Sequence, residues 1–261
     1  MKKRPLGQNF LVDLNAARRI LELAGISPGE PVLEIGPGKG VLTGGLIERS
    51  GVLTAIEIDP RLCAELTKRF GSDPGFRLLQ ADALKFDYSS LGARFKVVSN
   101  LPYYAAVPIL KRLVHYGARI SDMTLMLQKE VADRLVAEPG SKAYGSLSVF
   151  VQYHCQVERL LEVGKSAFYP PPKVESTVIR ATPLVRPKVE VNDEKMFFSI
   201  VHAAFFHKRK MLKNNLKAWE KQFDLDRNKI HLAGIDLARR GETLSLEDFA
   251  VISNVIHSAN V

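Results

Sequence analysis

Short apolar runs alternate with helical patterns through the first two thirds of the chain, and this alternation most restricts its fold. The runs typical of buried strands are residues 32–35, 52–58, 77–80, 96–99 and 123–127. Helical patterns separate them at residues 40–49, 60–70, 107–116 and 129–137. Such alternation predicts an α/β fold, a parallel sheet with helices on both faces. Later runs at 147–157 and 176–181 are expected to add antiparallel strands at one edge.

The pattern changes after a segment punctuated by Pro183 and Pro187. Beyond Asp193 the apolar spacing becomes helical, and Val201, Phe205, Leu212 and Leu216 fall on one stripe. We therefore expect an α/β domain over residues 1–184 and a small helical domain over residues 185–261.

The charge balance favours a polyanionic partner. Lys and Arg outnumber Asp and Glu 37 to 28, which gives a formal net charge of +9 among 261 residues. A surplus of this size is typical of proteins that bind nucleic acid. The two cysteines, Cys63 and Cys155, form no disulfide framework, and no signal peptide or membrane span is apparent. We expect a cytoplasmic protein without a membrane partner.

The first predicted strand ends in a glycine-rich turn, EIGPGKG. Gly36 and Gly38 let the backbone approach a ligand and adopt positive φ. The dinucleotide fingerprint GxGxxG requires a glycine where Val41 stands, so a nicotinamide dinucleotide, and with it an oxidoreductase, is disfavoured. A turn without any ligand is the alternative.

Two acids follow the next strands and favour a ligand. Glu57 ends the second strand, where a carboxylate accepts hydrogen bonds from a ribose diol. Asp82 follows the third strand, where a carboxylate accepts from an adenine amino group while the backbone N–H of Ala83 reaches a ring nitrogen. Each acid alone is more often a solvated residue. Together with the glycine turn they predict an adenosine pocket at the carboxyl edge of the sheet.

This combination resembles the class I S-adenosylmethionine-dependent methyltransferases, which have a Rossmann-like fold. The resemblance implies S-adenosyl-L-methionine as the cofactor.

The fourth strand ends in an unusual sequence, Asn100-Leu101-Pro102-Tyr103. The lone pair of an adenine amine is delocalised into the ring, so the amine is a poor nucleophile. Two acceptors on its N–H groups would free that pair. We expect the Asn100 side-chain oxygen to be one and the Leu101 carbonyl, aimed by Pro102, to be the other. Tyr103 can stack on a flipped base.

No arrangement for nucleophilic catalysis and no metal-ligand spacing such as HExxH accompanies these residues. We therefore expect direct methyl transfer without a metal.

Motifs along nearly the whole chain resemble the small-subunit ribosomal-RNA adenine N6,N6-dimethyltransferase family, of the KsgA type. The quoted stretches are GQNFLVD, EIGPGKGVLT, EID, ADAL, NLPYY, MLQKEVADRL, FYPPPKVES and HKRKMLKNNL. The resemblance implies that Gln8, Asn9 and Leu11 contact the cofactor, and that Phe168 is a second ring that stacks on the substrate base.

The family transfers four methyl groups, two to each of two adjacent adenosines in a hairpin near the 3′ end of small-subunit ribosomal RNA. Its substrate is an immature small ribosomal subunit, its role lies in small-subunit biogenesis, and its members are usually monomeric.

The basic stretch of the helical domain is expected to grip RNA phosphates. Its cations are Lys208, Arg209, Lys210, Lys213 and Lys217. The alternative is a solvated helix face.

Three other functions remain as alternatives. One is methylation of a single adenosine in large-subunit RNA by the related antibiotic-resistance enzymes. A DNA adenine methylase is a second, disfavoured by its different strand-end motif. The third is a ribosome-assembly checkpoint that binds the immature subunit and needs methylation only to leave.

Overall fold

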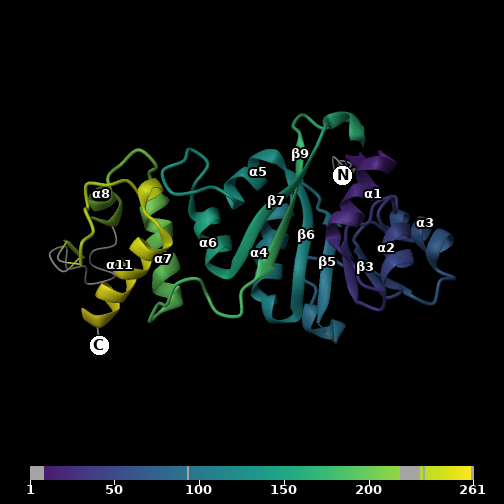
Figure 1. Cartoon of the computed structure of the whole chain (residues 1–261), viewed down its shortest axis with the longest axis horizontal. Helices are drawn as coiled ribbons and strands as arrows, with labels where there is room; N and C mark the ends of the chain where they lie inside the picture. The colour runs from purple at the N-terminus through teal and green to yellow at the C-terminus, as the bar shows by residue number, and fades with distance from the viewer. Residues whose placement is uncertain (1–8, 93, 218–229, 232, 260–261) are drawn as a thin grey trace, which may run out of the picture. The chain divides into compact units, whose positions relative to one another are not determined.

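The structure, a computed structural model, describes residues 9–92, 94–217, 230–231 and 233–259. Its central feature is a seven-stranded mixed sheet with strand order β4-β3-β2-β5-β6-β9-β7. The strands are β2 (Val32–Ile35), β3 (Leu53–Glu57), β4 (Phe76–Gln80), β5 (Phe95–Asn100), β6 (Ile120–Gln128), β7 (Cys155–Val163) and β9 (Ser176–Pro183). The first five are parallel, and β9 runs antiparallel to β6. Figure 1 shows β5, β6, β9 and β7 within this sheet.

The order of the strands reverses between β2 and β5. From β2 the chain proceeds outward through β3 to β4, then returns to place β5 on the other side of β2 and β6 beyond it. Such a reversal leaves a crevice at the carboxyl ends of the two central strands. The ends of β2 and β5 carry the glycine turn and Asn100, so both motifs belong to this crevice.

The helices around the sheet begin at recognisable capping residues. They are α1 (Leu14–Ala24), α2 (Thr43–Ser50), α3 (Pro60–Phe70), α4 (Ala106–His115) and α5 (Lys129–Leu135). Asp13 caps α1 by accepting hydrogen bonds from the backbone N–H groups of Asn15 and Ala16. Asp59 caps α3 in the same way, with Pro60 at the first helical position. Helix α2 packs on β2 and β3, and α3 packs on β3 and β4.

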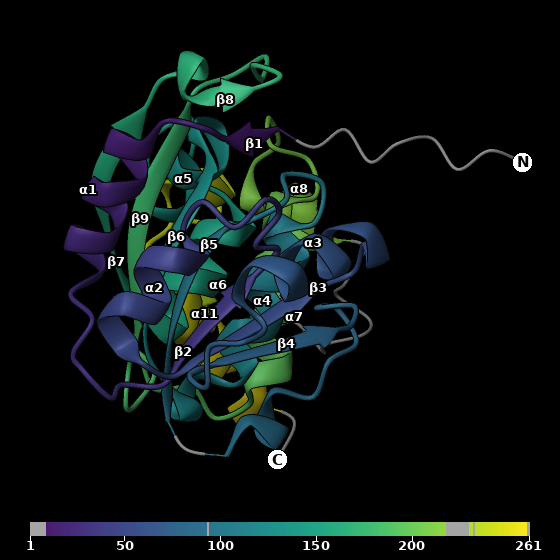
Figure 2. The ribbon, with the colours of Figure 1, turned by 90° about the vertical axis from the view of Figure 1, so that its right-hand side faces the viewer.

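Short elements complete the chain. A two-stranded sheet joins β1 (Phe10–Leu11) to β8 (Phe168–Tyr169), visible at the top of Figure 2. The 3-10 turns are η1 (Tyr88–Leu91), η2 (Gly117–Arg119), η3 (Lys165–Ala167) and η5 (Gly241–Thr243). The remaining helices are α6 (Ser146–His154), α7 (Glu194–Phe205), α8 (Leu212–Leu216) and α11 (Leu246–Ala259). None of the described helices combines the length and apolar composition needed to cross a membrane.

The chain forms two compact units. One comprises residues 1–132 and 156–185, and the other comprises residues 133–155 and 186–261. The second unit therefore contains residues 133–155, which include α6, in addition to the C-terminal segment expected from its helical spacing. Its core joins Tyr153 of α6 to Phe197 of α7, whose rings stack at 5.0 Å between centroids.

The strand expected at 147–157 is wrong. Helix α6 occupies residues 146–154, and strand β7 begins only at Cys155. Leu147, Ser148, Val149 and Val151 are all buried, so the helix has no long polar face to reveal a helical period. Its β-branched and aromatic residues then imitate a strand.

The apolar stripe of the second unit is also interrupted. Val201 lies in α7, whereas Leu212 and Leu216 lie in α8, and residues 206–211 form a turn between the two helices. All four residues of the stripe pack in or against one core, with Phe205 half-buried. The cations Lys208, Arg209 and Lys210 therefore stand on a turn rather than on a continuous helix face.

Glu34 is a carboxyl group buried in the central strand β2, with only 2% of its surface exposed. Its pKa is raised to about 8, chiefly by burial and also by the charge of Glu57, while the hydrogen bond from the Thr43 hydroxyl at 2.7 Å opposes the rise. The folded state therefore holds a proton on Glu34 at neutral pH.

We predict that Glu34 makes the protein less stable as pH rises. Its folded pKa lies above the unfolded value of 4.5, so unfolding releases a proton between pH 4.5 and about 8. Over this window the free energy of unfolding of the wild type should fall by roughly 4 kcal/mol more than that of Glu34→Gln. Denaturant titrations of both cofactor-free proteins at several pH values measure this. Parallel pH dependences would mean that Glu34 is already ionised when folded.

Candidate active site

The glycine turn after β2 forms one wall of a cavity at the carboxyl edge of the sheet. Gly36 and Gly38 have φ of +66° and +58°, a backbone conformation that side chains disfavour. A Cβ added to Gly38 would lie 3.0 Å from the Phe10 ring, which packs directly on the turn. The two glycines therefore keep the backbone exposed to whatever enters the cavity.

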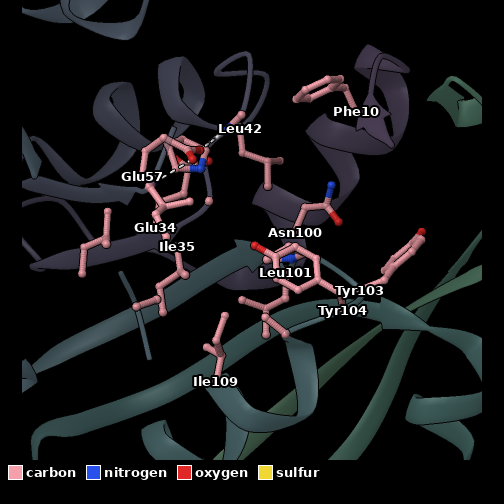
Figure 3. Close-up of a pocket in the computed structure, with 18 of the residues that line it drawn as sticks. Phe10, Glu34, Ile35, Leu42, Glu57, Asn100, Leu101, Tyr103, Tyr104 and Ile109 are labelled. Carbon is pink, nitrogen blue, oxygen red and sulfur yellow. Dashed lines mark hydrogen bonds between the residues drawn. The ribbon is translucent and has the colours of Figure 1, made fainter. Parts of the chain in front are cut away.

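Glu57, at the end of β3, ties the glycine turn to the neighbouring strand. Its carboxylate is 4% exposed and accepts hydrogen bonds from the backbone N–H groups of Ile58 at 2.8 Å and Asp59 at 3.0 Å. Its other oxygen accepts from Gly38 N–H at 3.3 Å. A carboxylate has about four lone-pair sites, so acceptor capacity remains for a ligand. Figure 3 shows Glu57 beside Glu34 on one side of the cavity.

Asp82 and Ala83 follow β4 and line the same cavity. One Asp82 oxygen accepts from the backbone N–H of Leu84 at 2.9 Å. The Ala83 carbonyl accepts from the Tyr88 hydroxyl at 2.8 Å, and Tyr88 is fully buried. This bond holds the peptide between Ala83 and Leu84.

The sequence Asn100-Leu101-Pro102-Tyr103 leaves the central strand β5 and enters α4. Backbone pairing holds Asn100 opposite Met126 of β6, and Leu101 N–H donates to the Met126 carbonyl at 3.2 Å. The Pro102 carbonyl accepts from Ala105 N–H at 2.9 Å as the chain turns into the helix. Asn100, Leu101 and Pro102 line the cavity, as expected from the strand pattern.

The two tyrosines of this motif have different surroundings. The Tyr103 hydroxyl forms a 2.6 Å hydrogen bond with the hydroxyl of Ser176, a buried residue at the start of β9. Burial raises the pKa of Tyr103. Tyr104 is 60% exposed, yet its pKa is raised by partial burial and by the charges of Glu57 and Asp82. Tyr104 therefore faces the acidic side of the cavity. In the sequence, its only signal is its place directly after Tyr103.

The segment before α1 covers the glycine turn. Phe10 and Leu11 pair with β8, and the Asn9 side-chain amide donates to the Pro170 carbonyl at 2.6 Å. The Lys39 ammonium lies 5.2 Å from the centroid of the Phe10 ring. Asn9 and Leu11 line the cavity as expected. Gln8 lies outside the described residues.

Phe168 does not occupy the place expected for a ring that stacks on a substrate base. Its side chain is 3% exposed and packs in the core of the first unit with Leu11 and Val178. The cavity lining does not include it. Tyr169, its neighbour in β8, is the exposed ring of this motif. Because β1 pairs with β8, the strand pairing that seats Leu11 also turns Phe168 into the core.

The expected cofactor residues that the structure describes converge on this cavity. They are Asn9, Leu11, Gly36, Gly38, Glu57, Asp82, Ala83 and Asn100. Phe10, Glu34, Lys39 and Tyr104 also line it and were missed. Glu34 could not be recognised from the sequence, because it lies within the apolar run of β2, where the flanking residues indicate only a buried strand.

The charges of the lining discriminate between cofactors. Three acidic side chains, Glu34, Glu57 and Asp82, line the cavity, and Glu34 is protonated at neutral pH, whereas Lys39 is the one Lys or Arg among the described lining residues. A pyrophosphate would be repelled by this lining. A nucleoside that carries positive charge, such as the sulfonium and ammonium groups of S-adenosylmethionine, fits it.

The cations expected to grip RNA lie together in the second unit. Lys208, Arg209 and Lys210 are exposed on the turn between α7 and α8. Lys213 is exposed on α8, and Lys217 is exposed just after it.

Comparisons with known proteins identify the family of the chain. The profile of the ribosomal RNA adenine dimethylase family matches residues 1–258. The curated "Ribosomal RNA small subunit methyltransferase A" of Aromatoleum aromaticum is 44% identical over 254 residues, which cover 97% of this chain and 94% of the relative. The protein of the same name from Moorella thermoacetica is 43% identical, over 97% of this chain and 92% of the relative.

Two solved structures share the fold. A dimethyladenosine transferase from Plasmodium falciparum superposes with a TM-score of 0.80 at 23% identity, covering 97% of this chain and 98% of the other. The 23S rRNA methyltransferase ErmE superposes with a TM-score of 0.72 at 26% identity, covering 95% and 100%. Both confirm the expected Rossmann-like methyltransferase fold with C-terminal helices.

The cavity with its glycine turn and acids, the strand-end asparagine and a profile match over almost the whole length point to one assignment. Family members are S-adenosylmethionine-dependent enzymes, in agreement with the acidic cavity. The chain belongs to the ribosomal RNA adenine dimethylase family.

Proposed function

We propose that this protein transfers methyl groups from S-adenosyl-L-methionine to the N6 amines of two adjacent adenosines in the 3′-terminal hairpin of small-subunit ribosomal RNA. It does so during small-subunit biogenesis, as a monomer in the cytoplasm. The observation that carries the proposal is the position of Asn100, at the end of β5 in the cavity that the glycine turn and three carboxyl groups also line.

The cofactor would lie along the carboxyl ends of β2, β3 and β4. Gly36 and Gly38 would contact its methionine part, Glu57 would accept from the ribose diol, and Asp82 with the Ala83 N–H would hold the adenine. The β1 segment, with Asn9 and Leu11, would close over it. When bound, the cofactor supplies a methyl group on a positively charged sulfonium.

The residues at the end of β5 act on the other reactant, the amine. The Asn100 side-chain oxygen and the Leu101 carbonyl accept hydrogen bonds from the two N–H groups, which draws the nitrogen toward tetrahedral geometry and frees its lone pair. Holding the amine in line with the methyl group and the sulfur contributes a large part of the rate enhancement, because effective molarities of well-oriented reactants reach about 10⁵ M or more. No strong base is needed, since the methylated ammonium is acidic.

Tyr103 is the proposed platform for the flipped base. Its bond to Ser176 fixes the direction of the ring without using a ring face. Stacking on such a ring is worth about 1–3 kcal/mol per base. Phe168, buried in the core, is not part of this proposal.

The choice of small-subunit RNA rests on the relatives and on the basic surface. Relatives at 43–44% identity over 97% of the chain carry the small-subunit name, whereas ErmE, at 26%, is a 23S enzyme of the same fold. Lys208, Arg209, Lys210, Lys213 and Lys217 would hold phosphates of the subunit RNA.

Incubation of purified, undermethylated small subunits and of large subunits with methyl-labelled cofactor tests the substrate. Label should enter the small subunit alone. Label in large-subunit RNA would instead favour the activity of the antibiotic-resistance enzymes. Binding to small subunits without any transfer would leave only the assembly-checkpoint role.

We predict that Asp82→Ala weakens cofactor binding by about 1.5–3 kcal/mol, the worth of a hydrogen bond to a charged group. Calorimetric titration with S-adenosylmethionine measures the change. Glu65→Ala, an exposed acid on α3, serves as the control and should bind as the wild type does. Equal affinity of the Asp82 variant and the wild type would remove Asp82 from the adenine site.

We predict that Asn100→Ala lowers turnover roughly 100-fold or more while cofactor affinity changes by less than about tenfold. An acceptor that acts on the amine mainly in the transition state should affect the rate rather than binding. Single-turnover transfer to small subunits and cofactor titration give the two numbers. A variant with near-normal turnover would show that the Leu101 carbonyl suffices.

We predict that replacing Lys208, Arg209 and Lys210 together by Gln weakens subunit binding and reduces its salt dependence. Each phosphate contact contributes about 0.7–0.9 to the slope of log affinity against log salt, so three contacts should remove about two to three units. Cofactor affinity should not change. If the slope of the triple variant equals that of the wild type, these cations belong to a solvated surface.

A further inference from the structure

The turn between α7 and α8, residues 206–211, exposes an aromatic ring next to its cations. Phe206 is 64% exposed, and Met211 at the other end of the turn is exposed as well. Between them lie His207, Lys208, Arg209 and Lys210, all exposed. A single exposed apolar side chain is ordinary on a protein surface. Here the ring directly precedes a run of cations, and that combination calls for an explanation.

The backbone of the turn is held from within the second unit. Asn215, on α8, is 4% exposed, and its side-chain amide donates to the carbonyls of Ala204 at 2.7 Å and His207 at 3.1 Å. The Lys210 N–H donates to the His207 carbonyl at 3.0 Å. At the far end Met211 bridges Arg240, and Leu212 N–H donates to the Arg239 carbonyl at 2.7 Å. Phe206 is therefore presented by an anchored turn.

The rings of two histidines lie beside Phe206. The His207 ring is 4.8 Å from it between centroids, and the His202 ring, one helical turn earlier on α7, is 6.4 Å away. Both pairs are steeply inclined, at 77° and 66°. Both histidines are themselves exposed. The ring therefore belongs to a polar, solvent-facing group rather than to the core.

The charge of this segment is not balanced along the chain. No Asp or Glu occurs from residue 195 to residue 217, a stretch that contains the five cations of the RNA-binding proposal. The nearby arginines differ, because Arg239 pairs with Asp248 at 2.9 Å and Arg240 lies 3.9 Å from Glu242. The cations of the turn thus have no acidic neighbour in sequence, whereas Arg239 and Arg240 each lie beside an acid of their own segment.

We propose that Phe206 stacks on an unpaired base of the small-subunit RNA while Lys208, Arg209 and Lys210 hold the phosphates that flank it. The proposal rests on the proposed function and adds a second base contact outside the methylation cavity. An aromatic ring beside a cationic track is the usual means of binding single-stranded nucleic acid, since each base offers a π-face to the ring and a phosphate to the cations.

The test compares the affinity of undermethylated small subunits for four variants across a salt series. Phe206→Ala and Phe206→Leu should each weaken binding about tenfold to a hundredfold, the range expected for loss of one stacked base. Phe206→Tyr keeps the ring and should stay within about twofold of the wild type. Val251→Ala, which alters an exposed apolar residue on α11, is the control and should not change affinity.

Salt dependence separates the ring from the cations. The Phe206 variants should lower affinity with the slope against salt unchanged, because they remove no charge. An affinity of Phe206→Ala equal to that of the wild type would overturn the proposal. So would full affinity in Phe206→Leu, because an apolar contact rather than stacking would then suffice.

A photo-cross-linking phenylalanine analogue placed at position 206 identifies the partner. With subunits bound, the cross-link should be to RNA. A cross-link to a ribosomal protein, or none, would overturn the stacking. If the wild type itself fails to bind small subunits, the proposed function fails, and this result differs from the selective loss that the Phe206 variants test.

Discussion

The site depends on one constraint, the parallel pairing of β2, β3, β4 and β5. Parallel strands bring all their carboxyl ends to the same edge of the sheet. The register of the pairing then decides which residues of neighbouring strands lie side by side. The glycine turn, Glu57, Asp82 and Asn100 each leave a different strand, yet all line one cavity. The reversal of strand order between β2 and β5 opens the crevice in which this edge becomes a site.

The charge of the cavity explains why an amide rather than an acid ends β5. Three carboxyl groups already line this space, and burial, together with the charge of Glu57, raises the pKa of Glu34 to about 8. A fourth carboxylate beside them would share that tendency to bind a proton. A protonated acid offers a donor where the proposed mechanism requires an acceptor for the amine. The neutral amide of Asn100 keeps an acceptor oxygen at every pH, without adding charge to an acidic pocket.

The sequence predicted the parts of the fold that local patterns record. Buried strands such as β2 are short apolar runs, and α3 begins at a proline after a capping aspartate. The glycines and acids that follow the strands are recognisable in the sequence itself. The errors lie where tertiary packing decides. Helix α6 is buried around most of its circumference and resembles a strand. Phe168 has the motif position of a site residue, but the pairing of β8 with β1 places it in the core. Glu34 does not stand out in sequence, and Tyr104 appears there only as the second of two tyrosines, because only the folded edge of the sheet brings both to the cavity.

We propose above all that this edge of the sheet methylates the N6 amines of two neighbouring adenosines twice each. Nucleoside mass spectrometry of small-subunit RNA, reacted to completion and mapped by position, tests that claim most directly. The account predicts N6,N6-dimethyladenosine at two adjacent positions of one 3′-terminal hairpin, four methyl groups per subunit. A single modified adenosine, a product that stops at monomethyladenosine, or methylation of a ring nitrogen would contradict it.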